Sequence, residues 1–122
     1  MLKQFAAYPN APTLVVTESG AAFPDVVRHG RVADPARRAY LQAAIGQVLR
    51  ARRAGIEVGG YFAWSLTDNF EWAEGYGPRF GLIHIDYDTQ ERIVKDSGRW
   101  YQAFLGGEAV ARQPQQATAL QQ

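Results

Sequence analysis

The sequence predicts an α/β fold built on parallel strands. Two apolar segments rich in β-branched or aromatic residues, 13–17 and 56–66, flank a segment with helical periodicity, 35–54. A strand–helix–strand order places the two strands side by side and parallel in one sheet. A parallel sheet needs cover on both faces, which two strands and two helices cannot supply. The sequence therefore predicts a piece of a larger α/β architecture.

The first strand and the helix have recognisable boundaries. Residues 13–17 are apolar on both faces, which is typical of a buried parallel strand. The glycine- and proline-containing segment 19–33 predicts a long loop. Asp34 is the expected N-cap of the helix, because an acceptor followed by Pro35 is a common helix start. We expect the arginines of this helix, Arg37 among them, to form a solvated face.

The second strand and the region after it carry different signals. A Gly59-Gly60 pair inside 56–66 predicts close approach of a neighbouring backbone. Residues 67–79 predict a second loop. Residues 80–94 alternate imperfectly between apolar and polar around a turn, which predicts a hairpin or a strand with an extended return.

The last helix is expected to begin at an Asp96 cap and to end at Gly106-Gly107. We assign residues 1–106 to the folded segment. Residues 107–122 are rich in Gln and Ala without an apolar stripe, and we expect a disordered tail there.

Composition excludes several classes of function. The chain has 13 basic and 12 acidic residues, a net charge of +1, so no electrostatic argument favours nucleic acid or an anionic membrane as a partner. The absence of cysteine excludes disulfides, zinc–thiolate sites and a cysteine nucleophile. No apolar run approaches the roughly 18 residues of a membrane span, and the first residues lack a signal-peptide core. We expect a cytoplasmic protein.

Carboxylates and large aromatic side chains follow both predicted strands. Catalytic residues of α/β barrels lie at the carboxyl ends of strands, where Glu18 follows the first strand. Indole rings stack on pyranose faces and carboxylates accept hydrogen bonds from hydroxyls, so this grouping indicates a sugar site. Glycoside hydrolysis needs two carboxyl groups at the scissile bond. The candidates after the second strand are Trp64, Asp68, Glu71, Trp72 and Glu74.

Simpler interpretations remain open at this point. Glu18 could be solvated or paired with an arginine, and Trp64 and Trp72 could belong to the core. His84 in the alternating segment is expected to be structural or exposed, and His29 solvated. Two isolated histidines form no metal-binding pattern, and we expect neither metal nor cofactor.

Two stretches read VVTESGAAFPD and GYFAWSLTDNFEWAEGYGPRFGLIHIDYDTQERIVKDSGRWYQ. With their blocks WSLTDNFEW, RFGL and KDSGRWY in order, they closely resemble the C-terminal part of glycoside hydrolase family one, the β-glucosidases and their relatives. The resemblance covers about residues 5–105. The family fold is a (β/α)8 TIM barrel. The resemblance therefore implies the last two βα units of that barrel, and the opening LKQFAAYPNAP resembles the end of the preceding helix and its loop.

The resemblance also implies a role for individual residues. Glu18 matches the catalytic nucleophile of a retaining β-glucosidase, which attacks the anomeric carbon. Trp64 matches the platform beneath the sugar, and Glu71 matches the glutamate that binds the 4- and 6-hydroxyls. Trp72 matches a residue that contacts the 3-hydroxyl, and Phe80 an aromatic residue that lines the same pocket.

The sequence departs from the family pattern at two places. Ser19 stands where the family usually has Asn, and the Asn-Glu-Pro motif that holds the family's acid/base does not occur. We therefore expect a C-terminal fragment that carries the nucleophile but not the acid/base, and that is weakly active or inactive alone. Its expected partners are a β-glucoside or related β-glycoside and the missing N-terminal barrel portion. The alternative is a non-catalytic sugar-binding or remnant fragment.

Overall fold

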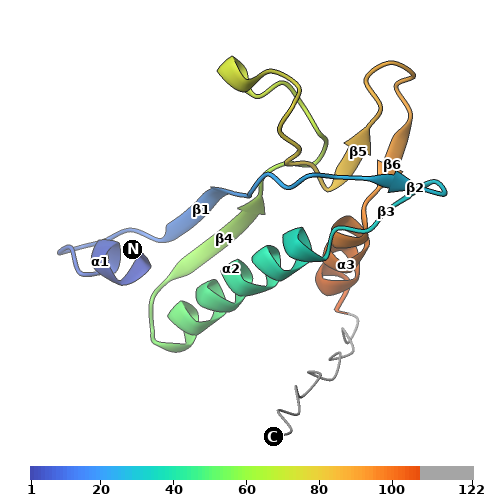
Figure 1. The fold of residues 1–122 in the computed structure, drawn as a ribbon. Helices are drawn as coiled ribbons and strands as arrows, with labels where there is room; N and C mark the ends of the chain where they lie inside the picture. Colours follow the sequence, from blue (N-terminus) through green and yellow to red (C-terminus); the bar gives the residue numbers. More distant parts are fainter. Residues whose placement is uncertain (108–122) are drawn as a thin grey trace, which may run out of the picture.

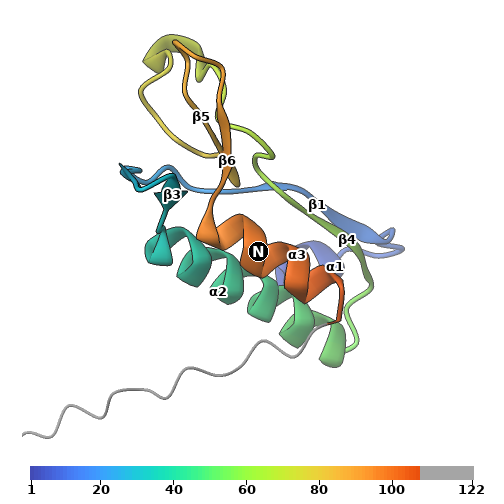
Figure 2. The same cartoon turned by 90° about the vertical axis from the view of Figure 1, so that its right-hand side faces the viewer.

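The computed structural model describes residues 1–107, which form two layers (Figure 1). One layer is a pair of strands, β1 (Leu14–Ser19) and β4 (Val58–Ala63). The other is a pair of helices, α2 (Pro35–Arg53) and α3 (Asp96–Leu105), which lie side by side on one face of the strands (Figure 2). The remaining elements are α1 (Leu2–Ala6), β2 (Val27–Arg28), β3 (Arg31–Val32), the 3-10 helix η1 (Trp72–Glu74), β5 (Ile83–Ile85) and β6 (Arg92–Val94).

The parallel pairing predicted from the strand–helix–strand order is confirmed. Val16 lies opposite Tyr61 in a parallel β1–β4 ladder. The close backbone approach predicted at the glycine pair is also present. A Cβ atom on Gly59 would stand 2.7 Å from the Thr13 side chain, so any larger residue there would force the two strands apart.

The strand bounds and the burial of the strands differ from the prediction. β1 runs on to Ser19, so it includes Glu18 at its carboxyl end, and β4 stops at Ala63. The expectation of a strand buried on both faces is wrong, because Val15 is 49% exposed and Phe62 is 59% exposed. Helices cover only one face of this two-stranded sheet, which leaves the other face open.

The helix α2 forms almost as predicted, but the side chain of Asp34, the residue before it, does not cap it. Asp34 is at the N-cap position and Pro35 follows it, yet the Asp34 carboxylate caps no helical N–H. It accepts hydrogen bonds from the backbone N–H and the hydroxyl of Ser97 at 2.8 and 2.5 Å. Asp34 therefore ties the start of α2 to the start of α3. Gly55, with φ +84°, ends the helix as expected.

The segments outside the main sheet form two small hairpins. The predicted 19–33 loop contains the β2–β3 hairpin, which turns at His29 and Gly30, both with positive φ. The predicted hairpin within 80–94 is confirmed as the antiparallel β5–β6 pair. The helix α1 lies where the resemblance placed the end of a helix.

The start of α3 corrects one prediction. Lys95, and not Asp96, is the N-cap residue, and Asp96 is the first helical residue. Its two carboxylate oxygens accept hydrogen bonds at 2.9 and 2.8 Å from Arg31 on the β2–β3 hairpin. The predicted end at Gly106-Gly107 is confirmed. The predicted tail lies outside the described residues except for Gly107.

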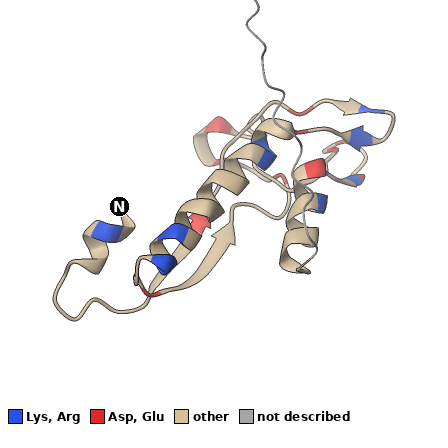
Figure 3. Cartoon of the chain, turned by 90° about the horizontal axis from the view of Figure 1, so that it is seen from below, with Lys and Arg blue, Asp and Glu red and all other residues tan. Residues whose placement is uncertain are grey.

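The apolar core lies between the helices and the sheet. Leu41 and Ile45 of α2 meet Trp100 of α3 and Leu82, with Tyr61 packed against them. None of the helices within residues 1–107 is long and apolar enough to cross a membrane. The helix α2 carries five arginines and no acidic residue, and the acidic residues of 1–107 lie on other elements and loops (Figure 3), so the net charge is near zero.

Candidate active site

The two predicted strand-end residues Glu18 and Trp64 lie at the same edge of the sheet. Because β1 and β4 are parallel, their carboxyl ends meet there, with Ser19 opposite Ala63. The Trp64 N–H donates a 2.9 Å hydrogen bond to the Ser19 carbonyl, which extends the ladder one residue beyond β4. Both side chains are exposed, and Trp64 retains 39% of its surface. The alternative that Trp64 is a core residue is wrong for this chain.

The Glu18 side chain is exposed at the end of β1. Its neighbour Ser19 faces the helices, since the Ser19 hydroxyl lies 3.3 Å from the Tyr40 hydroxyl of α2. The β1–β4 register shifts between Val16 and Ser19, so the alternation of a regular strand does not hold across Glu18. None of the ion pairs or hydrogen bonds within residues 1–107 involves the Glu18 carboxylate. The alternative that an arginine neutralises Glu18 is therefore not realised here.

The remaining predicted sugar-site residues lie on the segment 69–80, which we call the 69–80 loop. It projects from the sheet together with the β5–β6 hairpin (Figures 1 and 2). Glu71 and Phe80 are half-buried, whereas Trp72 is 82% exposed. Ring contacts support the loop, with Tyr76 4.7 Å from Tyr87 between ring centroids. Among the described residues, no hydrogen bond or ring contact joins these side chains to Glu18 or Trp64.

A buried network of ion pairs lies among the loops that follow β1 and β4. Most of this network was not predicted from the sequence. Arg37 is 2% exposed, and its guanidinium donates to Asp25 at 3.0 Å and to Asp34 at 2.5 Å. The prediction that Arg37 is solvated is wrong. A signal was present, because Arg37 stands four residues before Leu41 and eight before Ile45, on the buried stripe of the helix.

Lys95 connects the loops that follow β1 and β4. It is fully buried, and its ammonium pairs with Asp25 and donates a 2.8 Å hydrogen bond to Asp68. Arg79 adds a second cation 3.1 Å from Asp68. The network holds equal charge of each sign, three cationic and three anionic side chains: Arg37, Arg79 and Lys95 against Asp25, Asp34 and Asp68.

The network includes a group that could ligate a metal, which the sequence did not predict. Ligand atoms of Asp25, Asp68 and His84 lie within 4.8 Å of one another. The Lys95 ammonium already pairs with both carboxylates, however, and it supplies the positive charge that a metal ion would bring. The chemistry of this donor set therefore fits a lysine-centred ion cluster better than a metal site.

Two pKa values reflect this environment. Burial raises the pKa of Asp68, but the hydrogen bond and charge of Lys95, with donors from Gly81 and Arg79, outweigh it, so the pKa lies below its usual value. Burial lowers the pKa of His84, and the charge of Arg79 lowers it further. Of the two predicted alternatives for His84, structural or exposed, the structural one is confirmed, since the residue is only 8% exposed. Its Nδ1 lies 3.5 Å from an Asp68 carboxylate oxygen and has no hydrogen-bond partner within residues 1–107.

We expect His84 to make the folded state less stable as the pH falls from 7 to 5. The pKa of His84 is lowered in the folded state, so the unfolded chain takes up the proton first, below its pKa of about 6.5. The melting temperature, measured by circular dichroism across this range, should therefore fall with pH. His84→Gln should flatten the slope, and His29→Gln, at the exposed turn of the β2–β3 hairpin, should preserve it. Equal slopes in His84→Gln and the parent would contradict this assignment.

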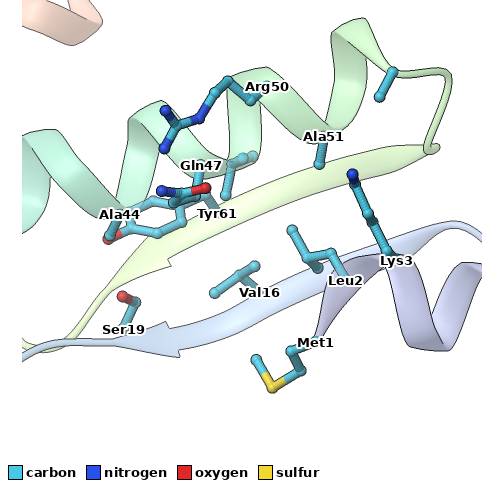
Figure 4. Close-up of a pocket in the computed structure, with 12 residues that line it drawn as sticks. Met1, Leu2, Lys3, Val16, Ser19, Ala44, Gln47, Arg50, Ala51 and Tyr61 are labelled. Carbon is cyan, nitrogen blue, oxygen red and sulfur yellow. The ribbon is translucent and has the colours of Figure 1, made fainter.

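A cavity of about 550 Å³ lies between the two strands and the helices α1 and α2 (Figure 4). Its walls come from α1, β1, β4 and α2, with Leu2, Val16, Tyr61 and Ala51 among them. Glu18 does not line it, and the walls are mostly apolar. The cavity belongs to the packing between helices and sheet and not to the candidate site.

Comparison with known proteins defines the class. Residues 2–109 match the sequence profile of the family described as Glycosyl hydrolase family 1. The chain therefore belongs to glycosyl hydrolase family 1, whose members are O-glycosyl hydrolases of the β-glucosidase type.

Curated relatives in that family are several times longer than this chain. Over 102 residues it is 56% identical to Beta-glucosidase A of Thermotoga maritima, covering 83% of this chain and 23% of the relative. It is 51% identical over 96 residues to a β-glucosidase of an Agrobacterium species, covering 79% of this chain and 21% of the relative. The chain thus spans less than a quarter of the length of these curated relatives.

Solved structures give the same relationship in three dimensions. The family 1 β-glucosidase from Thermotoga maritima superposes with a TM-score of 0.86 at 51% identity, covering 91% of this chain and 25% of the other. The same enzyme in complex with noeuromycin gives a TM-score of 0.85 with 90% and 25% coverage. The α/β unit described above therefore aligns with part of a family 1 barrel.

Proposed function

We propose that this chain supplies the nucleophile and part of the sugar pocket of a retaining β-glucosidase. β1 and β4 are then the seventh and eighth strands of the barrel. The observation that carries the proposal is the position of Glu18, an exposed carboxylate without an ion-pair partner beside Trp64 at the carboxyl edge of two parallel strands. Membership of glycosyl hydrolase family 1 supports it.

In this mechanism Glu18 attacks the anomeric carbon of a terminal β-D-glucosyl unit and the bond to the aglycone breaks. A glycosyl–enzyme ester forms, and water then hydrolyses it with overall retention of configuration. The first step is accelerated by an acid that protonates the leaving oxygen, about 5–5.5 Å from the nucleophile. None of the glutamates in this sequence lies in an Asn-Glu-Pro motif, so we assign this acid to the rest of the barrel.

The sugar contacts are divided between the carboxyl edge and the 69–80 loop. Trp64, exposed beside Glu18, stacks on the pyranose ring. Glu71 accepts hydrogen bonds from the 4- and 6-hydroxyls and Trp72 contacts the 3-hydroxyl, while Phe80 lines the pocket wall. The large exposed surface of Trp72 supports a role in contact with a ligand or with further protein.

The partner that completes the site is the remaining portion of the barrel. The uncovered sheet face carries exposed Val15 and Phe62, and each of the two strands has one unpaired edge. The apolar cavity beside β1 and α1 offers a further packing surface (Figure 4). These surfaces suit neighbouring strands and helices of the same barrel.

A chimera tests this proposal. Residues 2–109 of this chain replace the matching segment of the Thermotoga maritima enzyme, and an aryl β-glucoside is the substrate. We expect the chimera to hydrolyse it with retention, seen by NMR of the first-formed sugar. The isolated chain should be slower by about 100-fold or more, since general acid catalysis contributes roughly 10²–10⁴-fold.

Three results would contradict the proposal or part of it. A folded chimera without turnover would contradict the assignment of the nucleophile to this chain. An isolated chain that binds a non-hydrolysable glucoside saturably, followed by tryptophan fluorescence, while the folded chimera stays inactive, would instead support a sugar-binding module. A chain as active alone as in the chimera would show that the acid is also present in these residues.

A further inference from the structure

The 69–80 loop leaves and rejoins the body of the molecule at one carboxylate, that of Asp68. Asp68 directly precedes the loop, and its Oδ1 accepts a 2.9 Å hydrogen bond from the backbone N–H of Gly81, which directly follows it. Its Oδ2 accepts a 3.1 Å hydrogen bond from Arg79 near the end of the loop. One buried side chain at the start of the loop thus bonds to two residues at its end.

The same carboxylate is fixed from below. Lys95 donates to Oδ1 at 2.8 Å, and the backbone N–H of Ile85 on β5 approaches Oδ2 at 3.4 Å. Asp68 is 4% exposed and Lys95 is fully buried, so water does not compete for these bonds. The Asp68 carboxylate therefore holds the loop ends through bonds that are shielded from solvent.

At its two ends the loop has further hydrogen bonds with the body, from the Asn69 amide to the Ser65 hydroxyl at 3.3 Å and from Arg37 to the Arg79 carbonyl at 2.7 Å. Residues 70–78, which hold Glu71 and Trp72, form no hydrogen bond with the rest of residues 1–107. The internal hydrogen bonds of the loop, such as Glu71 N–H to the Gly75 carbonyl at 2.7 Å, shape the turn but do not place it.

The loop contacts the β5–β6 hairpin through the Arg79 guanidinium, which donates to the Ile85 carbonyl at 2.7 Å. It also contacts Tyr87, which packs on Tyr76 and whose hydroxyl lies 3.3 Å from the Asn69 carbonyl. Trp72, at 82% exposure, has little support of its own.

We propose that Asp68 is a positioning residue, whose ionised carboxylate joins the two ends of the 69–80 loop and thereby places Glu71 and Trp72 for contact with the sugar. The inference rests on the proposed function for the identity of that ligand. The role requires an acceptor on both oxygens. An asparagine at this position would present an NH2 group to cations or N–H donors on one side, and would leave at least one of them unpaired.

The full-length chain labelled with 5-fluorotryptophan tests the structural half of this inference. Its three tryptophans, Trp64, Trp72 and Trp100, report on the carboxyl edge, the loop and the core respectively. In Asp68→Asn we expect the Trp72 fluorine resonance to shift and broaden while that of Trp100 is unchanged. Amide exchange at Gly81 should accelerate by about tenfold or more. Asp86→Asn is the matched control, since Asp86 also accepts two backbone N–H bonds but in an exposed turn.

The chimera described above tests the functional half. Asp68→Asn should raise KM by about tenfold and leave kcat within about threefold, because the loop contributes sugar contacts and not the reacting groups. If Asp68→Asn does not fold, Arg79→Gln removes the bonds of the Arg79 guanidinium to Asp68 and to the Ile85 carbonyl at a partly exposed site, and should give the same pattern more weakly.

The outcomes separate this inference from the proposed function. An unchanged Trp72 resonance, or a KM equal to that of the parent chimera, would overturn the positioning role while an active parent chimera would leave the proposed function standing. A folded parent chimera without activity would contradict the proposed function. The fluorine spectra would then still decide whether Asp68 holds the loop.

Discussion

Glu18→Ala in the chimera is expected to lower kcat/KM for an aryl β-glucoside by about 10⁴-fold or more, because removing a covalent nucleophile abolishes the glycosyl–enzyme route. The exposed position of Glu18 at the end of β1 means that the substitution leaves no buried group unpaired. The fold should therefore survive. Circular dichroism and the melting temperature should match those of the parent.

Addition of azide should give a diagnostic product in the same variant. A small anion can occupy the space that the carboxylate vacates and attack the anomeric carbon from the same face. The product is then a glycosyl azide of inverted, α, configuration, which NMR identifies. The matched control is Glu57→Ala, because Glu57 lies next to the opposite end of β4, where it accepts a hydrogen bond from Thr13 at 2.6 Å. An equal loss of kcat/KM in both variants would contradict the assignment of Glu18 as the nucleophile.

Lys95→Met is expected to lower the free energy of unfolding of the isolated chain by about 3–5 kcal/mol, because it removes a fully buried cation and leaves two buried carboxylates without it. The ordinary stability of a small domain is only about 5–15 kcal/mol, so the variant should be close to unfolded at room temperature. Urea denaturation followed at 222 nm measures the difference.

The comparison variant is Lys3→Met, which removes an exposed lysine from α1 and should change stability by less than about 0.5 kcal/mol. A triple variant, Lys95→Met with Asp25→Asn and Asp68→Asn, should recover part of the loss, since it also removes the uncompensated charge. If Lys95→Met were as stable as the parent, the buried ion cluster would not contribute to the stability of the fold.

The parts of the fold that the sequence predicted are those set by local signals. Pro35 and Gly55 mark the ends of α2, and the glycine pair at 59–60 marks the close approach to β1. The bounds of β1 were less accurate, because the end of a strand depends on its partner. The ladder continues through Ser19 since β4 lies alongside it.

The candidate residues could be named from motifs, but their environment could not. Asp25 and Lys95 are 70 positions apart in sequence, and nothing local to either indicates that they pair in the interior. Asp34 has every local mark of a helix cap, yet tertiary donors from Ser97 take its carboxylate. Long-range pairing between charged groups is decided by the packing of α2 against α3, which periodicity does not encode.

The ion cluster around Lys95 also bears on how barrels of this family can be recombined. All of its six charged members belong to residues 25–95 of one short chain, so a crossover placed before β1 would transfer it whole. The backbone of the 69–80 loop, and with it the proposed sugar contacts of Glu71 and Trp72, should then keep its shape on a foreign barrel. Exchange of this segment between relatives should therefore transfer those contacts as a unit, without redesign of the interior that supports them.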